Sequence, residues 1–160
     1  MNGSKGYRAD PSDNHVESLP VLSLTTVNKM LPLVERIVGD FLHGRHELNR
    51  LQPEEARLDR QRRDLSWPER QRRYEVKERV AGAEHEMQGA VEELGDLGVV
   101  LLDQDFGRVG FPTMVNNRRA FFSWRPGEDG LHTWHFAEDE VFRPIPAAWL
   151  KEISGAGGKN

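Results

Sequence analysis

The chain contains no cysteine, and this absence excludes several kinds of chemistry. Disulfide bridges, cysteine-ligated zinc, iron–sulfur clusters and thiol nucleophiles all require that residue. Long apolar runs are also lacking, because no stretch approaches the ~20 apolar residues that cross a bilayer. The first twenty residues are polar and hold no apolar segment of signal-peptide length. We therefore expect a soluble protein of the cytoplasm that does not enter a membrane.

An excess of one charge sign is lacking as well. The chain carries 26 acidic and 22 basic residues, for a formal net charge of −4. A general nucleic-acid binder usually shows a strong basic excess, so this balance argues against a nucleic-acid partner. Apolar residues make up 37% of the chain and charged residues 30%, which is typical of exposed amphipathic helices. Few residues are left to bury in a compact core, and this favours self-association.

The two ends of the chain differ in composition from its middle. Residues 1–20 and 154–160 are rich in glycine and small polar residues and show no apolar periodicity. We expect them to be disordered tails. The chain of 160 residues then has room for a single domain, which we place at residues 21–153.

A first helix is predicted at residues 25–51, where apolar residues recur every three or four positions. Its apolar stripe consists of Val27, Met30, Leu31, Val34, Ile37, Val38, Phe41 and Leu48. Thr25 or Thr26 supplies the short hydroxyl that caps a helix start. Pro32 either sits in the first turn after a short lead-in or kinks a longer helix.

A second helix is predicted at residues 66–94. Ser66 and Glu69 form a capping-box pattern at its start, and Gly95 has the freedom of a left-handed C-terminal cap. The thinner apolar stripe of this helix consists of Tyr74, Val80, Ala81, Glu84, Met87, Val91 and Leu94. The two stripes predict an antiparallel helical hairpin, in which the charged residues 54–65 either extend a helix or form a mobile link.

After Gly98 the apolar period changes to two, which indicates strands within residues 99–136. The expected strands are Val99–Leu102, Arg108–Phe111, Ala120–Arg125 and Leu131–Phe136, with turns at Asn116–Asn117 and Pro126–Gly130. A small antiparallel β-meander of this size is marginal alone, so we expect it to pack on the helices. The sequence therefore predicts an α+β fold, a long helical hairpin followed by a small antiparallel sheet.

Several short motifs carry a resemblance to a known family. They are Leu24–Val34, Leu94–Val99, Gly107–Pro112, Phe121–Glu128 and the pair Trp134–His135. Over residues 22–144 the chain resembles the prokaryotic domain of unknown function family 2203. That family has no established activity, so the resemblance implies a fold and a set of positions but no reaction.

The candidate site lies around the turn at Gly127. Glu128 and His135 stand at the two ends of a hairpin, where a carboxylate and an imidazole could meet for proton transfer. With Asp139, the pair could also form a mixed histidine and carboxylate site for a divalent metal, although the sequence requires no cofactor. Trp124, Trp134 and Arg143 complete the candidate ligand site. In the competing interpretation, Glu128 anchors the turn and His135 is a satisfied, half-buried group.

Charges of opposite sign gather in two neighbouring segments. Residues 54–79 hold nine basic and seven acidic residues, whereas residues 84–105 hold seven acidic residues and no lysine or arginine. Interleaved charges in the first segment are typical of a solvated helix. An acidic partner, such as another copy of this chain, is the second interpretation, because the acidic segment could complement the arginines across a dimer.

The sequence shows no nucleotide-binding loop, nucleophile motif or metal-ligand spacing. We therefore favour a non-enzymatic interaction or structural module that self-associates, with a homodimer as the favoured assembly and another protein as a further partner. The alternative is a protein that binds a small ligand or a metal, and a hydrolase-like enzyme is one form of this alternative. Its site would have Glu128 and His135 at the centre.

Overall fold

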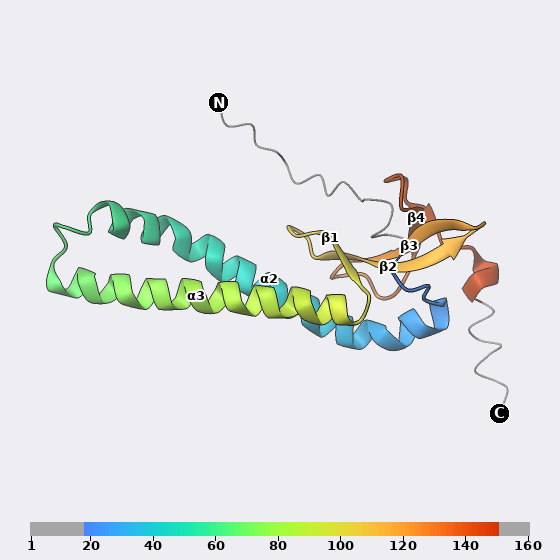
Figure 1. Cartoon of the computed structure of the whole chain (residues 1–160), viewed down its shortest axis with the longest axis horizontal. Helices are drawn as coiled ribbons and strands as arrows, with labels where there is room; N and C mark the ends of the chain where they lie inside the picture. The colour runs from blue at the N-terminus through green and yellow to red at the C-terminus, as the bar shows by residue number, and fades with distance from the viewer. Residues whose placement is uncertain (1–17, 151–160) are drawn as a thin grey trace.

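Two long helices and a five-stranded antiparallel sheet are the main elements of residues 18–150, the part of the chain that the computed structural model describes, and residues 147–150 form a further helical turn (Figure 1). The elements are α2 (Leu24–Arg60), α3 (Trp67–Asp96), β1 (Val100–Asp103), β2 (Arg108–Val115), β3 (Arg118–Trp124), β4 (Thr133–Phe136) and β5 (Arg143–Pro144). Strand order follows the chain from β1 to β5. The expected α+β fold, a helical hairpin followed by an antiparallel meander, is confirmed.

The tails predicted at both ends lie largely outside the described residues, which begin at Ser18 and end at Leu150. The described part of the first tail is held in place. Arg119 donates hydrogen bonds to the carbonyl oxygens of Leu19 and Pro20 at 2.8 and 3.3 Å. These residues therefore contact the sheet.

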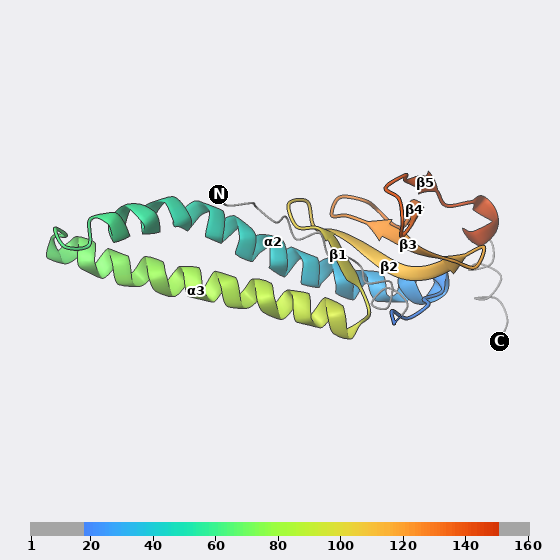
Figure 2. The same cartoon turned by 45° about the horizontal axis from the view of Figure 1, so that its top comes forward.

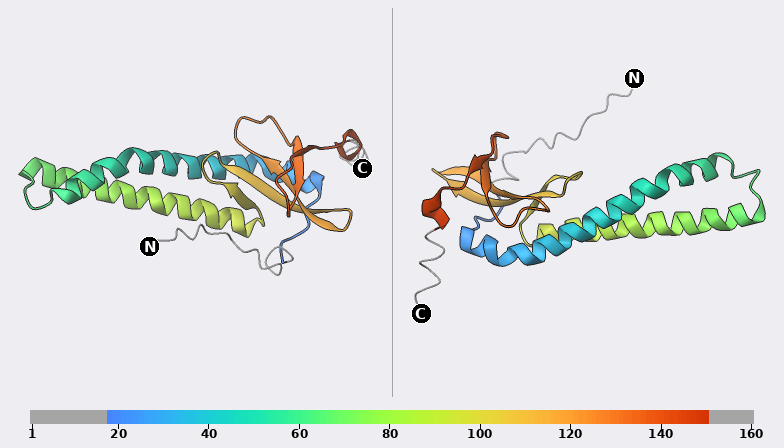
Figure 3. Two further views of the ribbon diagram at one scale, coloured as in Figure 1. Left: turned by 90° about the horizontal axis from the view of Figure 1, so that it is seen from above. Right: turned by 180° about the vertical axis from the view of Figure 1, so that it is seen from behind.

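α2 begins and ends differently from the sequence prediction. Its N-cap is Ser23, whose Oγ accepts a hydrogen bond from the amide of Thr26 at 3.1 Å, so the predicted caps at Thr25 or Thr26 are wrong. The helix continues to Arg60 through both Pro32 and Pro53. Each proline removes an amide donor, and α2 curves along its length (Figure 3). Residues 54–60, which the sequence left open, thus extend the first helix.

α3 starts as predicted and ends later. Ser66 is its N-cap, with the amide of Glu69 donating to Ser66 Oγ at 3.4 Å. The left-handed residue after the helix is Gly98, with φ of 76°, so the prediction of Gly95 as the cap is wrong. Gly98 is required for a second reason, because a Cβ there would lie 2.5 Å from Pro20 Cγ.

The buried stripe of α3 is rotated relative to the predicted one. It consists of Val76, Val80, Ala83, Ala90 and Leu94. Four residues of the predicted stripe are exposed instead, namely Tyr74, Ala81, Glu84 and Val91. Apolar residues are sparse on this helix, so two stripes compete in the sequence and contact with α2 decides between them.

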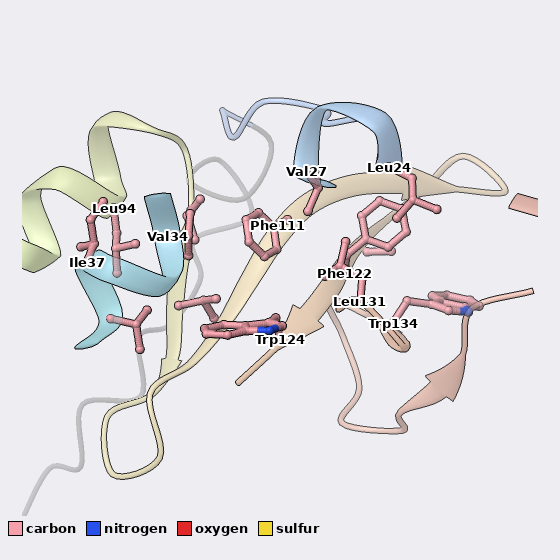
Figure 4. Packing of buried hydrophobic residues seen from close by; sticks show 14 of the residues in the cluster. Leu24, Val27, Val34, Ile37, Leu94, Phe111, Phe122, Trp124, Leu131 and Trp134 are labelled. Carbon is pink, nitrogen blue, oxygen red and sulfur yellow. The ribbon is translucent and has the colours of Figure 1, made fainter. Parts of the chain in front are cut away.

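The hairpin has two separate apolar cores. The main core joins the sheet-proximal half of the hairpin to one face of the sheet, and Figure 4 shows Phe111, Phe122 and Trp124 among its side chains. The second, which we call the distal core, lies between the far halves of the helices. It consists of Leu51, Leu58, Leu65, Val76 and Val80. The hairpin therefore forms an arm that extends well beyond the sheet (Figures 1 and 2).

The strands pair by short connections. Asn116 and Asn117 both have positive φ, 52° and 61°, and close the β2–β3 hairpin as predicted. Phe111 pairs with Phe122, and Phe122 pairs with Trp134, so alternate residues of three strands face the helices. The short strand β5, which the sequence did not predict, pairs with β4.

Ion pairs between the helices brace the arm. Arg72 Nε lies 2.6 Å from Glu54 Oε1, and Asp59 receives Lys77 Nζ at 3.0 Å and Arg73 Nε at 2.9 Å. These hydrogen bonds, from Lys77 first and then Arg73, hold the pKa of Asp59 below its usual value. The hydrogen bond from Arg72 likewise lowers the pKa of Glu54.

We predict that the arm loses stability in acid. A carboxyl group with a lowered pKa in the folded state stabilises the fold above its unfolded pKa, which is about 4. That stabilisation is lost as the pH falls through the lowered value. Thermal unfolding followed by circular dichroism should show a lower Tm at about pH 3 than at neutral pH. The Tm of Asp59→Asn should change less between neutral pH and about pH 3 than the Tm of the wild type. An equal change in the two proteins would contradict the proposal that ionised Asp59 stabilises the arm.

Candidate functional site

The candidate residues divide between the two faces of the sheet. Trp124 and Trp134 are 1% and 8% exposed and belong to the main core, on the face that packs against the helices. His135 follows Trp134 on β4, and side chains alternate along a strand, so His135 lies on the opposite face. We call that second face the outer face. The structure therefore separates the two tryptophans from the histidine.

Glu128 is used within its own turn. Its carbonyl oxygen accepts a hydrogen bond from Trp124 Nε1 at 3.2 Å, and its carboxylate lies 3.8 Å from Arg125 Nε. Within residues 18–150, no hydrogen bond or ion pair joins Glu128 to His135. The geometry of Glu128 is that of a turn anchor.

His135 is buried and only half satisfied. Its Nδ1 lies 2.8 Å from the carbonyl oxygen of Phe136 and 3.1 Å from that of Asp139. Because carbonyl oxygens only accept hydrogen bonds, Nδ1 carries a proton, and in the neutral ring Nε2 presents a lone pair. Nε2 is buried without a hydrogen-bond partner among the described residues. The ring packs against Phe121 and Phe142, with centroids 5.6 and 5.0 Å away.

Other polar groups share the outer face with His135. Arg108 Nη1 donates to Ser123 Oγ at 2.8 Å, and its guanidinium carbon lies 4.7 Å from the centre of the Phe142 ring. Thr133 pairs with Ser123 across the sheet, and its Oγ1 is also buried without a partner among the described residues. Sequence reasoning missed Arg108, Ser123 and Thr133 as neighbours of His135, because only the strand register shows which residues share a face.

Asp139 and Arg143 form a pair of their own. Arg143 Nη1 donates to Asp139 Oδ1 at 3.4 Å, and the amide of Val141 donates to the same oxygen at 3.2 Å. Burial tends to raise the pKa of Asp139, but the hydrogen bonds from Val141 and Arg143 outweigh it, and the pKa is lowered. The Arg143 guanidinium also lies 5.3 Å from the Trp134 ring. Both charged groups are therefore occupied within the protein.

The structure does not gather the three candidate metal ligands. Among residues 18–150, no group of three or more histidine, aspartate or glutamate side chains is arranged to hold a metal ion, and Glu128, His135 and Asp139 are no exception. Imidazole and carboxylate ligands would have to converge on one point for such a site. A metal on His135 would therefore need ligands from elsewhere.

A groove lies toward the β2–β3 turn of the sheet, and its lining residue Trp149 packs against Trp134 with ring centroids 5.6 Å apart. The groove has a volume of about 350 Å³. Its lining consists of Ser23, Leu24, Met114, Val115, Asn116, Phe122 and Trp149. No charged side chain lines it, so it offers apolar contact but no ionic anchor.

The arm carries two exposed groups of charge. We call Arg60, Arg62, Arg63 and Arg70 the tip arginines, because they surround the turn between the helices. All four are exposed, and no hydrogen bond or ion pair joins their guanidinium groups to another described residue. We call Glu92, Glu93 and Asp96 the acidic base, because they lie at the sheet end of α3, where all three are exposed.

Two aromatic side chains stand exposed near the tip. Trp67 is 68% exposed and Tyr74 is 71% exposed. Both lie on α3, about two helical turns apart, and so share the face that points away from α2. We call this the outer face of α3.

In the described part of the chain, no helix has the length and apolar character that a membrane span requires.

Comparison with known proteins gives one match. The model of a family described as an uncharacterised conserved protein, DUF2203, matches residues 21–143, which include both helices and the sheet as far as the start of β5. No curated protein sequence and no solved structure matches the chain. The match covers well over half of the chain and agrees with the resemblance seen in its motifs. The protein therefore belongs to the uncharacterised conserved protein family DUF2203.

Proposed function

We propose that the protein is an interaction module that self-associates through the outer face of α3, with a homodimer as the assembly. The exposure of Trp67 and Tyr74 carries this proposal. Tryptophan and tyrosine are the residues that most often anchor protein interfaces. Two such residues on the outer face of α3 favour the interpretation that a partner molecule covers this surface when the protein is assembled.

The aromatic pair supplies only part of the required free energy. Burying one large apolar side chain contributes about 1.5–3 kcal/mol, so the four rings of a symmetric dimer, two from each copy, contribute about 6–12 kcal/mol. A dimer with a micromolar dissociation constant needs about 8 kcal/mol, in addition to the entropy lost on association. Other contacts along the arm must therefore contribute, and the charged groups at its two ends are the available ones.

We predict that removing the aromatic pair weakens the dimer. In sedimentation velocity over a range of concentrations, the wild-type protein should shift from monomer to dimer. The double variant Trp67→Ala, Tyr74→Ala should raise the dissociation constant about tenfold or more. The reason is that truncating a hot-spot residue to alanine lowers the binding free energy by about 2 kcal/mol or more.

The matched control removes an equally exposed aromatic residue elsewhere. Phe106 is 64% exposed and lies in the loop between β1 and β2, outside α3. Phe106→Ala should leave the dissociation constant unchanged. A wild-type protein that stays monomeric at the highest concentration would contradict the proposed function.

We propose that this role is non-catalytic and exercised in the cytoplasm. Support for the first part comes from the sequence, which holds no nucleotide-binding loop or nucleophile motif. The charged residues nearest the candidate site are also committed to internal pairs, as Asp139 and Arg143 illustrate. Location in the cytoplasm stays a prediction of the sequence.

A second candidate function is small-ligand binding on the outer face of the sheet. One observation favours it, the buried Nε2 of His135 that has no partner among the described residues. A buried polar atom without a hydrogen bond costs about 1–3 kcal/mol, and a ligand or water would recover that cost. Metal-binding histidines commonly donate Nδ1–H to a carbonyl oxygen and present Nε2, as His135 does.

We predict that His135 keeps its Nε2 free of hydrogen in the neutral ring. Two-bond ¹⁵N–¹H NMR spectra report the tautomer directly and should show the proton on Nδ1. Metal analysis of protein purified without a histidine tag tests the ligand role. Stoichiometric metal in the wild type that is lost in His135→Ala supports this second function. Metal-free protein whose His135 signals do not move on adding Zn²⁺ counts against it.

A further inference from the structure

We infer that two copies of the chain associate antiparallel along α3, so that the tip arginines of each copy cover the acidic base of the other. This inference rests on the proposed self-association and names its partner and geometry. The partner is a second copy, and the contact surface is the outer face of α3 from Trp67 to Asp96.

Both ends of α3 carry charge that the helix itself does not favour. Arg70 follows the favourable Glu69 in the first turn, where the helix dipole is positive, and Arg62 and Arg63 lie just before it. At the other end, Glu93 and Asp96 lie where the dipole is negative, and the last turn holds no basic residue. Each end therefore gains from a neighbour of opposite charge, and an antiparallel α3 supplies one at both ends.

The separation of charge also disfavours the parallel arrangement. A parallel pair would place tip arginines against tip arginines and acids against acids, and like charges in contact oppose association. From Val80 to Gly107 the chain contains no lysine or arginine, so the acidic base has no basic neighbour of its own in that stretch. Among the described residues, the tip arginines are a group of exposed positive charges that could match it.

The residues along α3 match when two copies are aligned about the middle of the helix. Its midpoint falls between Ala81 and Gly82. Residues at equal distances on either side then face each other across a two-fold axis, as in an isologous dimer. Arg70 then lies level with Glu92 and Glu93 of the second copy, and Glu92 is the one on the same side of the helix as Arg70. Near the midpoint, Glu78 faces His85. Each of these pairs occurs twice.

Small residues give the aromatic side chains room. Ala81 and Gly82 lie at the midpoint, and a Cβ built on Gly82 or Gly89 meets no atom within 4 Å. The space above these glycines is therefore open to a neighbouring molecule. In the same alignment Tyr74 faces Gly89 of the second copy, so the ring packs on bare backbone, and Trp67 lies over the last turn that ends at Asp96.

A single-stranded nucleic acid is the competing occupant of the tip. Exposed arginines beside exposed aromatic rings are the groups that such strands bind. The acidic base on the same face of α3 and the net charge of −4 oppose it. A second copy satisfies both the positive and the negative end of the arm, whereas a nucleic acid satisfies only one.

Charge reversal tests the geometry. One variant carries Arg63→Glu and Arg70→Glu at the tip, and the other carries Glu93→Lys and Asp96→Lys at the base. All four side chains are exposed and form no hydrogen bond or ion pair among the described residues, so both variants should fold, as circular dichroism can verify. Each variant alone should raise the dimer dissociation constant about tenfold or more in sedimentation at low salt.

Mixing the two variants gives the decisive result. In the mixed dimer both tip-to-base contacts again join opposite charges, so an equimolar mixture should recover wild-type association as a heterodimer. If the wild type dimerises and each variant alone has the same dissociation constant as the wild type, the antiparallel geometry is wrong, but the proposal of self-association stands. If the wild type is monomeric, both proposals fail. Fluorescent single-stranded oligonucleotide that binds wild type but not the tip variant would overturn the assignment to a second copy.

Discussion

Trp124→Ala should lower the free energy of unfolding by about 3–5 kcal/mol, the range for removing a buried aromatic residue from a core. Trp124 is 1% exposed at the end of β3 and is among the largest fully buried side chains of the described residues. Its indole Nε1 also donates to the carbonyl oxygen of Glu128, so the variant leaves that acceptor without its donor. The variant thus loses apolar burial and a turn anchor together.

Urea denaturation followed by far-ultraviolet circular dichroism measures this loss. Trp67→Ala is the matched control, because it makes the same chemical change at a side chain that is 68% exposed. Under conditions where the protein is monomeric, the control should stay within about 0.5 kcal/mol of the wild type. A Trp124→Ala protein as stable as the Trp67→Ala protein would contradict the packing described for the main core.

Leu58→Ala should loosen the arm while the sheet stays folded. Leu58 is fully buried at 0% exposure in the distal core, which shares no member with the main core. Replacing a buried leucine with alanine costs about 2–5 kcal/mol, and the small distal core has few other contacts to absorb the loss. The opening should therefore be local, confined to the far halves of α2 and α3.

Hydrogen exchange followed by mass spectrometry separates local opening from global unfolding. Amide exchange should accelerate in peptides from residues 51–80 and stay unchanged in β2 and β3. Val91→Ala is the control, because Val91 is 43% exposed on the same helix. Faster exchange throughout the chain would show that the two cores unfold together and that the arm is not a separate unit of stability.

Features fixed by neighbouring residues could be predicted from the sequence. The Ser66 cap depends on the amide of Glu69, and the turn at Asn116 and Asn117 depends on two residues that tolerate positive φ. The end of the first helix cannot be decided from the sequence, because Pro53 suggests a break that burial of Leu51 and Leu58 against α3 overrides. The sequence places Tyr74 in the buried stripe of α3, but the structure exposes it. Nothing in the neighbouring sequence distinguishes the buried stripe of this helix from the exposed one.

The candidate site was harder to predict, since it depends on strand register. Residue type alone suggested that Glu128 and His135 meet, but no described contact joins them. The pairing of Phe121 with His135 places the histidine beside Phe142 and on the face of Ser123. A shift of one residue in that register would have turned His135 toward the helices. Short strands leave such registers undecided until the partner strand is known.

Cysteine crosslinking most directly tests the antiparallel dimer, and the chain has no cysteine of its own to interfere. Ala81→Cys, next to the proposed axis, should form a disulfide between two copies under mild oxidation. Gln71→Cys should not crosslink to itself, because antiparallel copies would hold those residues about 30 Å apart at 1.5 Å per residue. It should crosslink to Glu92→Cys when the two variants are mixed. Efficient crosslinking of Gln71→Cys to itself, with none at Ala81→Cys, would contradict the account.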